Sequence, residues 1–281
     1  FQQRFASDNQ CLAYLAAEKW KNGYACPKCG HTHYCAGGTQ YSRQCTRCKH
    51  TDSPTAGTLF HKVKFPLLKA FYIVYFVATS KKGISSTELS RKLGLRQKTC
   101  WYFKRKVMKA MESSGKYPLE GNVEVDEFFV GGQEEGKKGR GKEDKQLVVV
   151  AIEKKGRGVS RMYGKVIEHA DADSLGGFMR EKIAKKAKVR ADSWQGYSPL
   201  KKDFENLQQI PSGKKGGNFP EIHRTIMMFK AWLRGIHHSV ADLQAYIDEY
   251  TYRFNRSFMN AAIFDNLILR MIKAKPYYLY A

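Results

Sequence analysis

Two short cysteine pairs constrain the N-terminal third of this chain more than any other feature of its sequence. Cys26 and Cys29 are separated by two residues, as are Cys45 and Cys48, and fifteen residues lie between the pairs. Two such knuckles can bring four thiolates together around one tetrahedral Zn²⁺. The intervening segment 34–43 is typical of a hairpin, so the sequence predicts a zinc ribbon over residues 21–61.

Several other residues near the pairs offer alternative ligands. Cys35, His31 and His33 lie between the pairs, but the four-cysteine set is the more symmetrical. The chain has seven cysteines, an odd number, and Cys-x-x-Cys spacing in a reducing compartment favours metal over disulfides. We therefore predict one structural zinc ion, with Cys11 and Cys100 as buried apolar side chains.

The charge balance of the sequence indicates a polyanionic partner. Its 281 residues include 49 Lys and Arg against 26 Asp and Glu, a formal net charge of +23. Because 42% of the residues are hydrophobic, the chain can bury two or three cores, which excludes a disordered basic tail. The longest apolar run, 71–78, is far shorter than the roughly 20 residues that cross a bilayer, and no signal segment opens the sequence. We expect an intracellular protein without a membrane partner.

The most one-sided charge lies just after the predicted ribbon. Residues 61–110 contain thirteen Lys and Arg and a single acid, so DNA phosphates are the natural partner. Hydrophobic periodicity predicts a buried helix at 65–80. Two further helices, a short one that follows Ser86 and ends at Leu93 and a longer one over 97–110, are separated by a turn at Gly94-Leu95, a spacing typical of a helix-turn-helix.

The second helix of this pair would present its first residues to DNA. Side chains at a helix N-terminus can reach base edges in the major groove, and the helix dipole there favours phosphate. We assign residues 62–118 to a helix-turn-helix domain, preceded by a lead-in helix within residues 1–20. The predicted DNA contacts are Arg96, Gln97, Lys98 and Thr99, with Lys104 farther along the helix.

The remainder of the chain, residues 119–281, alternates strands and helices. The β-branched content predicts strands at 123–130, 146–152, 159–167 and 188–191, with a helix at 173–185. Three more helices are expected at 220–235, 240–254 and 261–274. Between the first two strands, residues 131–145 are rich in Gly, Lys, Arg and Glu, and we expect a mobile basic loop there. The predicted fold class is a multi-domain α+β chain whose last domain is α/β.

Two aspartates in this last region are candidate metal ligands. Asp126 lies mid-strand among apolar neighbours, where an unpaired carboxylate is costly to bury, and Asp192 ends a later strand. Two carboxylates on neighbouring strands can hold two Mg²⁺ ions for an in-line phosphoryl displacement. Glu124 and Glu127 are expected to point to the opposite strand face from Asp126, which makes them poorer ligands.

Several motifs together resemble one protein family. They are Asp126 with Gly131-Gly132, Asp192 with Trp194 and Tyr197, the cysteine pairs, Thr55-Ala56-Gly57-Thr58 and the run from Ile84 to Ser90. In this combination nearly the whole chain resembles insertion-sequence transposases with a zinc-ribbon head and a DDE catalytic domain. The resemblance implies an RNase H-like domain over 119–281, Mg²⁺ dependence, binding to terminal inverted repeats and DNA transposition. It also implies a prokaryotic, cytoplasmic protein associated with the nucleoid.

The third catalytic position departs from the commonest family pattern. The family places Glu, or sometimes Asn or His, on a helix with a Lys seven residues later, and here Lys230 follows His223 at that spacing. The implied catalytic residues are Asp126, Asp192, His223 and Lys230. The first three would bind Mg²⁺ or Mn²⁺, and Lys230 would contact DNA phosphate. Glu221 is the competing third ligand.

The predicted function is a DNA transposase that cleaves and joins double-stranded DNA. Two transposon ends must be held at once, so we expect a homodimer or a higher oligomer. The alternatives are a transposase-derived DNA-binding protein without catalytic activity and an RNase H-like junction nuclease. The seven-residue spacing to Lys230 argues against the first, and two separate recognition modules argue against the second.

Overall fold

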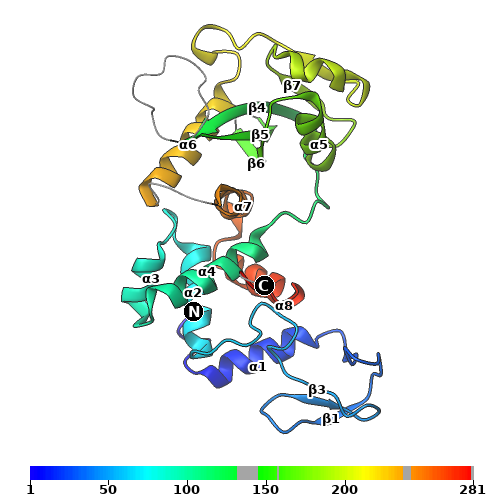
Figure 1. Ribbon diagram of the computed structural model, residues 1–281, viewed down its shortest axis with the longest axis vertical. Helices are drawn as coiled ribbons and strands as arrows, with labels where there is room; N and C mark the ends of the chain where they lie inside the picture. Colours follow the sequence, from blue (N-terminus) through cyan, green and yellow to red (C-terminus); the bar gives the residue numbers. More distant parts are fainter. Residues whose placement is uncertain (132–144, 157, 237–241, 280–281) are drawn as a thin grey trace. The chain divides into compact units, whose positions relative to one another are not determined.

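Two units, each with its own hydrophobic core, make up the fold. The computed structural model describes residues 1–131, 145–156, 158–236 and 242–279 (Figure 1). We call Phe1–Met111 with Met259–Ala281 the ribbon unit and Glu112–Phe258 the sheet unit. The basic loop expected between the first two strands lies almost wholly outside the described residues.

The ribbon unit begins with a helix and a small three-stranded sheet. Helix α1 (Asp8–Lys19) is capped by Ser7, whose hydroxyl accepts a hydrogen bond from the N–H of Gln10. Strands β1 (Tyr34–Ala36), β2 (Arg43–Cys45) and β3 (Thr51–Asp52) pair antiparallel in that order. The Lys19 ammonium donates to the Asp52 carboxylate at 2.7 Å, so it ties the lead-in helix to the last strand.

Four more helices complete the ribbon unit. They are α2 (Leu67–Thr79), α3 (Ser86–Leu93), α4 (Gln97–Met111) and, from the C-terminal end, α8 (Ala262–Lys273). The first three lie within two residues of the positions that the sequence predicts. Helix α2 is apolar on most sides because α1, α4 and α8 all pack against it.

Helix α8 is the main departure from the predicted domain boundaries. We expected residues 119–281 to form one catalytic domain, but residues 259–281 belong to the ribbon unit. The Arg4 guanidinium donates to both carboxylate oxygens of Asp265, at 3.0 and 2.9 Å, and the Tyr14 hydroxyl donates to the same group at 2.8 Å. These contacts join the two ends of the sequence, so local periodicity could not reveal them.

The sheet unit is built on a mixed five-stranded sheet. Its strands are β4 (Asn122–Val130), β5 (Gln146–Lys155), β6 (Gly158–Ile167), β7 (Lys188–Ala191) and β8 (Leu207–Gln209), in the order β6-β5-β4-β7-β8. Neighbours among β4, β5 and β6 are antiparallel, whereas β7 runs parallel to β4 and β8 parallel to β7. Strand β7 ends beside the middle of β4, and the two candidate aspartates lie at that point, Asp126 within β4 and Asp192 directly after β7.

Helices cover both faces of the sheet (Figure 1). Helix α5 (Ala172–Lys182), which connects β6 to β7, buries Leu175, Phe178 and Met179 against odd-numbered residues of β4 and β5. On the other face, α6 (Pro220–Ile236) packs Ile222 and Ile226 against even-numbered residues of β5. Helix α7 (Leu243–Phe254) contacts β6 on that side as well. The alternation follows the two-residue period of a strand.

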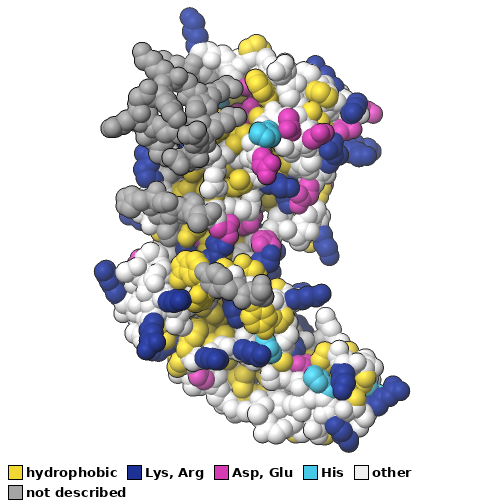
Figure 2. Space-filling model, viewed as in Figure 1, with side chains coloured by type: hydrophobic (Ala, Val, Ile, Leu, Met, Phe, Trp, Pro, Cys, Tyr) yellow, Lys and Arg dark blue, Asp and Glu magenta, His cyan; other side chains and the backbone are white. Residues whose placement is uncertain are grey.

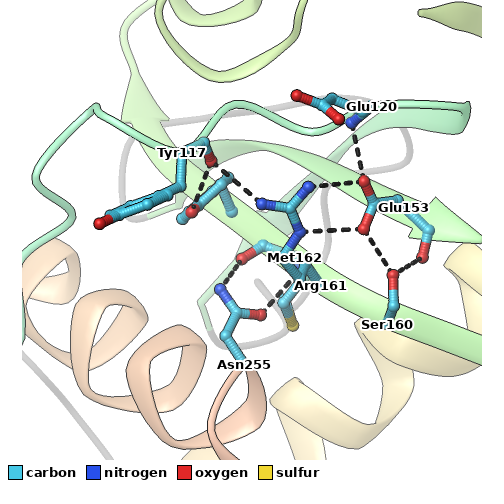
Figure 3. A network of polar contacts seen from close by, with 8 residues as sticks. Tyr117, Glu120, Glu153, Ser160, Arg161, Met162 and Asn255 are labelled. Atoms are coloured by element: carbon cyan, nitrogen blue, oxygen red, sulfur yellow. Dashed lines mark hydrogen bonds and ion pairs between the residues drawn. The ribbon is translucent and has the colours of Figure 1, made fainter.

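Side chains satisfy the backbone of β6, which is an edge strand. The Asn255 amide exchanges two hydrogen bonds with the backbone of Met162, at 2.8 and 2.9 Å. Nearby, Glu153 accepts hydrogen bonds from Arg161, Ser160 and the N–H of Glu120 (Figure 3). Burial works against the charge of Glu153, but these donors lower its pKa to about 2. A covered edge is protected from pairing with another chain.

Short elements of the sheet unit, among them strand β8 and a 3₁₀ helix, have no counterpart in the predictions. Strand β8 has three residues, too few to give a periodic pattern, and the 3₁₀ helix η1 (Gln195–Lys202) contains a proline.

Within the described ranges, no helix combines the length and apolar character that crossing a membrane requires.

Candidate functional site

The four predicted zinc ligands converge in the ribbon. The sulfur atoms of Cys26, Cys29, Cys45 and Cys48 lie within 4.8 Å of one another, with Cys26–Cys48 at 3.5 Å and Cys29–Cys45 at 3.6 Å. Tetrahedral zinc with bonds of about 2.3 Å spaces its sulfurs about 3.8 Å apart, so the cluster fits this ion. Burial opposes ionisation of Cys26, but N–H groups at Lys28 and Cys29 lower its pKa to about 6, which favours the thiolate.

The alternative zinc ligands have other partners. The Cys35 sulfur is exposed and lies 3.6 Å from the carbonyl oxygen of Gln44. His31 Nε2 is 3.1 Å from the Thr46 hydroxyl, and its ring packs near that of His33. Cys11, by contrast, is completely buried, and this burial raises its pKa to about 12.

Asp126 and Asp192 lie side by side on neighbouring strands. Strands β4 and β7 are parallel and pair Val125 with Ala191, so the next residue of each strand is one of the aspartates. Both line a cavity of about 480 Å³, with Glu127, His169, Asp171 and Trp194 among the other lining residues. Burial raises the pKa of Asp126, as does the charge of Asp192, while His223 lowers it. A divalent cation would relieve this repulsion, and carboxylates are its preferred ligands.

His223 approaches Asp126 from α6. Its Nε2 atom lies 3.2 Å from Asp126 Oδ2. Gly216 leaves room for the ring, because a Cβ atom there would lie 2.1 Å from His223 Nδ1 and its φ of +74° favours glycine. The described residues contain no second group with the mutual spacing of the cysteine sulfurs. The atoms of Asp126, Asp192 and His223 that could bind a metal are therefore spaced more widely than the four cysteine sulfurs.

Glu221, the competing third ligand, is engaged elsewhere. The Lys154 ammonium of β5 donates to Glu221 Oε2 at 3.1 Å and to Glu124 Oε1 at 3.0 Å. Burial works against the charge of Glu221, but Lys154 lowers its pKa. The bonds fix the first turn of α6 to the sheet and hold Glu221 on Lys154. The geometry therefore favours His223 over Glu221 as a ligand.

The expectation that Glu124 and Glu127 both point away from Asp126 is wrong for Glu124. Alternate residues of a strand share a face, so Glu124 lies on the face of Asp126. It is completely buried and also accepts a hydrogen bond from Arg190 at 3.3 Å. Only Glu127 lies on the opposite face, where it accepts a hydrogen bond of 2.7 Å from the Tyr197 hydroxyl.

The residues after Asp192 hold its loop in place, a role that the sequence did not indicate. The backbone N–H of Trp194 donates to Asp192 Oδ1 at 2.9 Å, and its indole N–H donates to the Ala170 carbonyl at 2.7 Å. A Cβ atom on Gly196 would lie 2.7 Å from that carbonyl, so only glycine permits this approach. Tyr197, through Glu127, joins the same loop to β4. These contacts depend on tertiary structure and leave no spacing signal.

Lys230 lies on the α6 face that carries His223. Its ammonium is 5.1 Å from the centre of the Phe128 ring. Burial lowers its pKa, as does the charge of Arg234, while Asp126 raises it. A cation whose charge acts on the Asp126 carboxylate is suited to contact a phosphate near that group.

The predicted recognition helix has the expected turn and one misassigned residue. Ser85 caps α3 through the N–H of Glu88, and Gly94 takes a left-handed conformation with φ of +59° before α4 begins. Arg96, Gln97 and Lys98 are exposed at this turn, and Thr99 is half-buried. Lys104 is buried, however, and its ammonium donates to the carbonyl of Ile84 at 2.9 Å. The prediction that Lys104 contacts DNA is therefore wrong, because its ammonium is occupied inside the fold.

Two separate parts of the chain match transposase domain families. Residues 118–255 match the ISXO2-like transposase domain family, and residues 6–51 match the transposase zinc-ribbon domain family. An uncharacterized protein in transposable element ISH50 of Halobacterium salinarum is 25% identical over 217 residues, which cover 71% of this chain and 72% of that protein.

Solved structures of Mos1 transposase complexes also align with the chain. A pre-cleavage Mos1 transpososome aligns at 11% identity and a TM-score of 0.30, over 73% of this chain and 78% of the other. A Mos1 mariner paired end complex with Mn aligns at 12% identity and a TM-score of 0.30, over 72% and 78%.

Proposed function

Because the chain belongs to the insertion-sequence transposases that carry an N-terminal zinc ribbon, we propose that it binds transposon ends and cleaves and joins DNA there. The sheet unit would carry the chemistry and the ribbon unit the recognition. Two ends must be held together during the reaction, so the active form would be a homodimer or a larger assembly on double-stranded DNA.

One observation supports the chemistry above all others. The register of β4 and β7 brings Asp126 beside Asp192, and His223 completes the group from α6. When bound by these residues, Mg²⁺ or Mn²⁺ would activate the attacking oxygen and offset the charge that develops on the phosphate. The chain's own residues would position the scissile strand, and the freed 3′-hydroxyl of the transposon would then attack target DNA.

Positioning would depend on three parts of the sheet unit. Lys154 holds the first turn of α6 so that His223 faces Asp126. The contacts of Tyr197 and Trp194 hold Asp192 at the cavity. Lys230 would bind a phosphate next to the scissile one. Its positive charge would offset the repulsion between the DNA phosphates and the acidic side chains of the site.

Recognition would fall to the exposed start of α4. Arg96 and Lys98 have no acid in their own turn of the helix, and a helix N-terminus attracts phosphate. Together with Gln97 and Thr99 they would contact the terminal inverted repeat. DNA binding would also place the protein with the nucleoid of a prokaryotic cell.

A single reaction tests this proposal. A labelled duplex that contains the terminal inverted repeat and its flanking DNA is incubated with the purified chain and Mg²⁺ or Mn²⁺. We expect nicks that leave a 3′-hydroxyl at the transposon end, followed by joined products, and neither with Asp192→Asn. A parent protein that binds the repeat without cutting it in either metal would instead support the non-catalytic DNA-binding alternative.

A further inference from the structure

Helix α6 exposes two methionines beside the candidate catalytic group. Met227 is 70% exposed and Met228 is 51% exposed, although both belong to a helix that packs against the sheet. Methionine is among the residues most often buried in folded proteins. Two exposed methionines in sequence therefore indicate a surface that another molecule covers.

Helical spacing places this surface next to the metal-ligand candidates. Residues three, four and seven apart share one face of a helix, so His223, Met227 and Lys230 lie along one line, and Arg234 continues it. The line runs beside the buried face, which holds Ile222, Ile226, Phe229 and Leu233, and Met228 projects about 100° around the helix from Met227. The exposed line thus begins at His223, beside the Asp126 carboxylate, and runs along α6.

The charge around the methionines selects a nucleic acid as the partner. Arg224 and Arg234 are exposed on either side of the pair, and Lys230 lies between them. The one acid of the helix, Glu221, is held by Lys154. A second copy that met this face across a two-fold axis would oppose like charges, whereas DNA supplies phosphates for the cations and apolar base faces for the methionines.

We propose that Met227 and Met228 form an apolar wedge that enters the base stack of the transposon end next to the phosphate held at Asp126. The inference rests on the proposed function, because it assumes that DNA occupies the site. A helix rises about 1.5 Å per residue, so Met227 lies about 6 Å along the axis from His223, or roughly two base steps of DNA. The wedge would therefore act on the first or second base pair beside the cleaved bond.

The chemistry of methionine suits this task. Its unbranched, polarizable side chain adapts to irregular surfaces, and apolar side chains including Met unstack base steps in other DNA-bending proteins. Opening the duplex beside the scissile phosphate would let that strand approach the carboxylates. The cations on either side would hold the phosphates of the opened step.

Base fluorescence tests the wedge without requiring cleavage. The full chain is bound to its terminal-repeat duplex in Ca²⁺, with 2-aminopurine placed one, two or eight base pairs from the cleaved bond. We expect fluorescence to rise about threefold or more at the first two positions and not at the eighth, as unstacking predicts. Met227→Ala with Met228→Ala should remove the rise, while affinity for the duplex falls less than about threefold.

Two variants serve as matched controls. Met227→Leu keeps an apolar side chain of similar volume and should keep the rise. Phe258→Ala removes another exposed apolar side chain of the sheet unit and should also leave the rise unchanged. In Mg²⁺ the double alanine variant should cut intact duplex about tenfold more slowly, and mismatches at the first two base pairs should restore its rate.

Three results would overturn the wedge. They are a bound parent protein that leaves 2-aminopurine quenched, a rise that persists in the double alanine variant, and a variant that loses its oligomeric state instead of its fluorescence signal. The last would assign the methionines to a contact between copies. Parent protein that raises the fluorescence yet cuts in neither Mg²⁺ nor Mn²⁺ would refute the proposed function while supporting the wedge.

Discussion

The two units divide the charge of the chain unequally. The ribbon unit carries 23 Lys and Arg against five Asp and Glu, whereas the sheet unit carries 26 against 21. On the face shown in Figure 2, Lys and Arg side chains spread over both units, while Asp and Glu lie mainly on the sheet unit. Most of the net charge of the chain therefore lies in the unit with the ribbon and the helical pair.

Under the proposed function, this difference would separate the attraction of DNA from the chemistry on it. A net positive unit raises the local concentration of a polyanion and holds it through many weak contacts. A site for divalent ions instead needs carboxylates, which repel phosphate until the ions are bound. Placing the two requirements in separate units lets each be met, and variants of one unit should then leave the property of the other unchanged.

Zinc removal should have the largest effect, and only on the ribbon unit. Cys45→Ser should lower bound zinc from one ion per chain to nearly none and unfold the ribbon, because zinc binding contributes on the order of 10 kcal/mol to such small folds. Metal analysis and thermal melting in the presence of a chelator check this. Zinc-free parent protein with an unchanged ribbon transition would contradict it, and Cys35→Ser is the control that should keep its zinc.

Loss of a metal-ligand carboxylate should abolish chemistry without weakening DNA binding. Asp126→Asn should slow strand cleavage by about a thousandfold or more, since neither ion nor attacking group is then held correctly. Its affinity for the terminal repeat, measured by gel shift, should stay within about twofold of the parent. A parallel loss of affinity would show that the sheet unit also carries recognition.

The third ligand should be His223. His223→Ala should slow cleavage about a hundredfold, whereas Glu221→Gln should slow it less than about tenfold, because Glu221 acts only through its bond to Lys154. His223→Glu, which restores the commoner family residue, is the variant to test for retained activity. If His223→Ala stayed active while Glu221→Gln was inactive, the third ligand would instead be Glu221, half a turn earlier in α6.

The start of α4 should control affinity and its salt dependence. Arg96→Ala with Lys98→Ala should weaken terminal-repeat binding about tenfold and reduce the salt slope by about two, as expected when two phosphate contacts are lost. Lys185→Ala with Lys186→Ala changes the charge of the sheet unit by the same amount at exposed positions and should have little effect. Equal losses in both variants would mean that total charge, and not the helix, decides affinity.

The sequence predicted those features that local chemistry determines. Four thiols at fixed spacing have few other uses. Helical spacing located α3 and α4, and β-branched content located β4 and β6, to within two residues. Predictions failed for residues whose environment depends on segments that are distant in the sequence. Lys104 looked like a phosphate contact because its burial against Ile84 cannot be seen from the sequence.

Relations between segments account for the wrong domain boundary and bear on the choice of a third ligand, which stays a prediction. Helix α8 joins the ribbon unit through contacts such as that of Asp265 with Arg4, from the opposite end of the sequence. Lys154 of strand β5 forms a hydrogen bond with Glu221 of α6, and this contact favours His223 over Glu221 as the third ligand. The sequence limited the third ligand to one turn of helix, and the tertiary contacts then favoured one side of that turn.

The smallest predicted effect concerns a carboxyl group in α7 of the sheet unit. Burial raises the pKa of Asp248 from its usual value near 3.8 to about 6, although a hydrogen bond from Gln244 opposes the shift. A folded-state pKa above the unfolded one contributes stability that is complete below about pH 4 and is lost as the pH rises through 6. Asp248→Asn should therefore stabilise the sheet unit by about 1 kcal/mol above pH 7, after allowing for partial solvent access, and by almost nothing at pH 4. Thermal melting of the parent and the variant at both pH values checks this. A chelator shifts only the transition of the zinc ribbon, so the transition that it leaves unchanged belongs to the sheet unit. A gain of equal size at pH 4, or a shift of the chelator-sensitive transition, would mean that the substitution acts by some route other than the ionisation of a carboxyl group in the sheet unit.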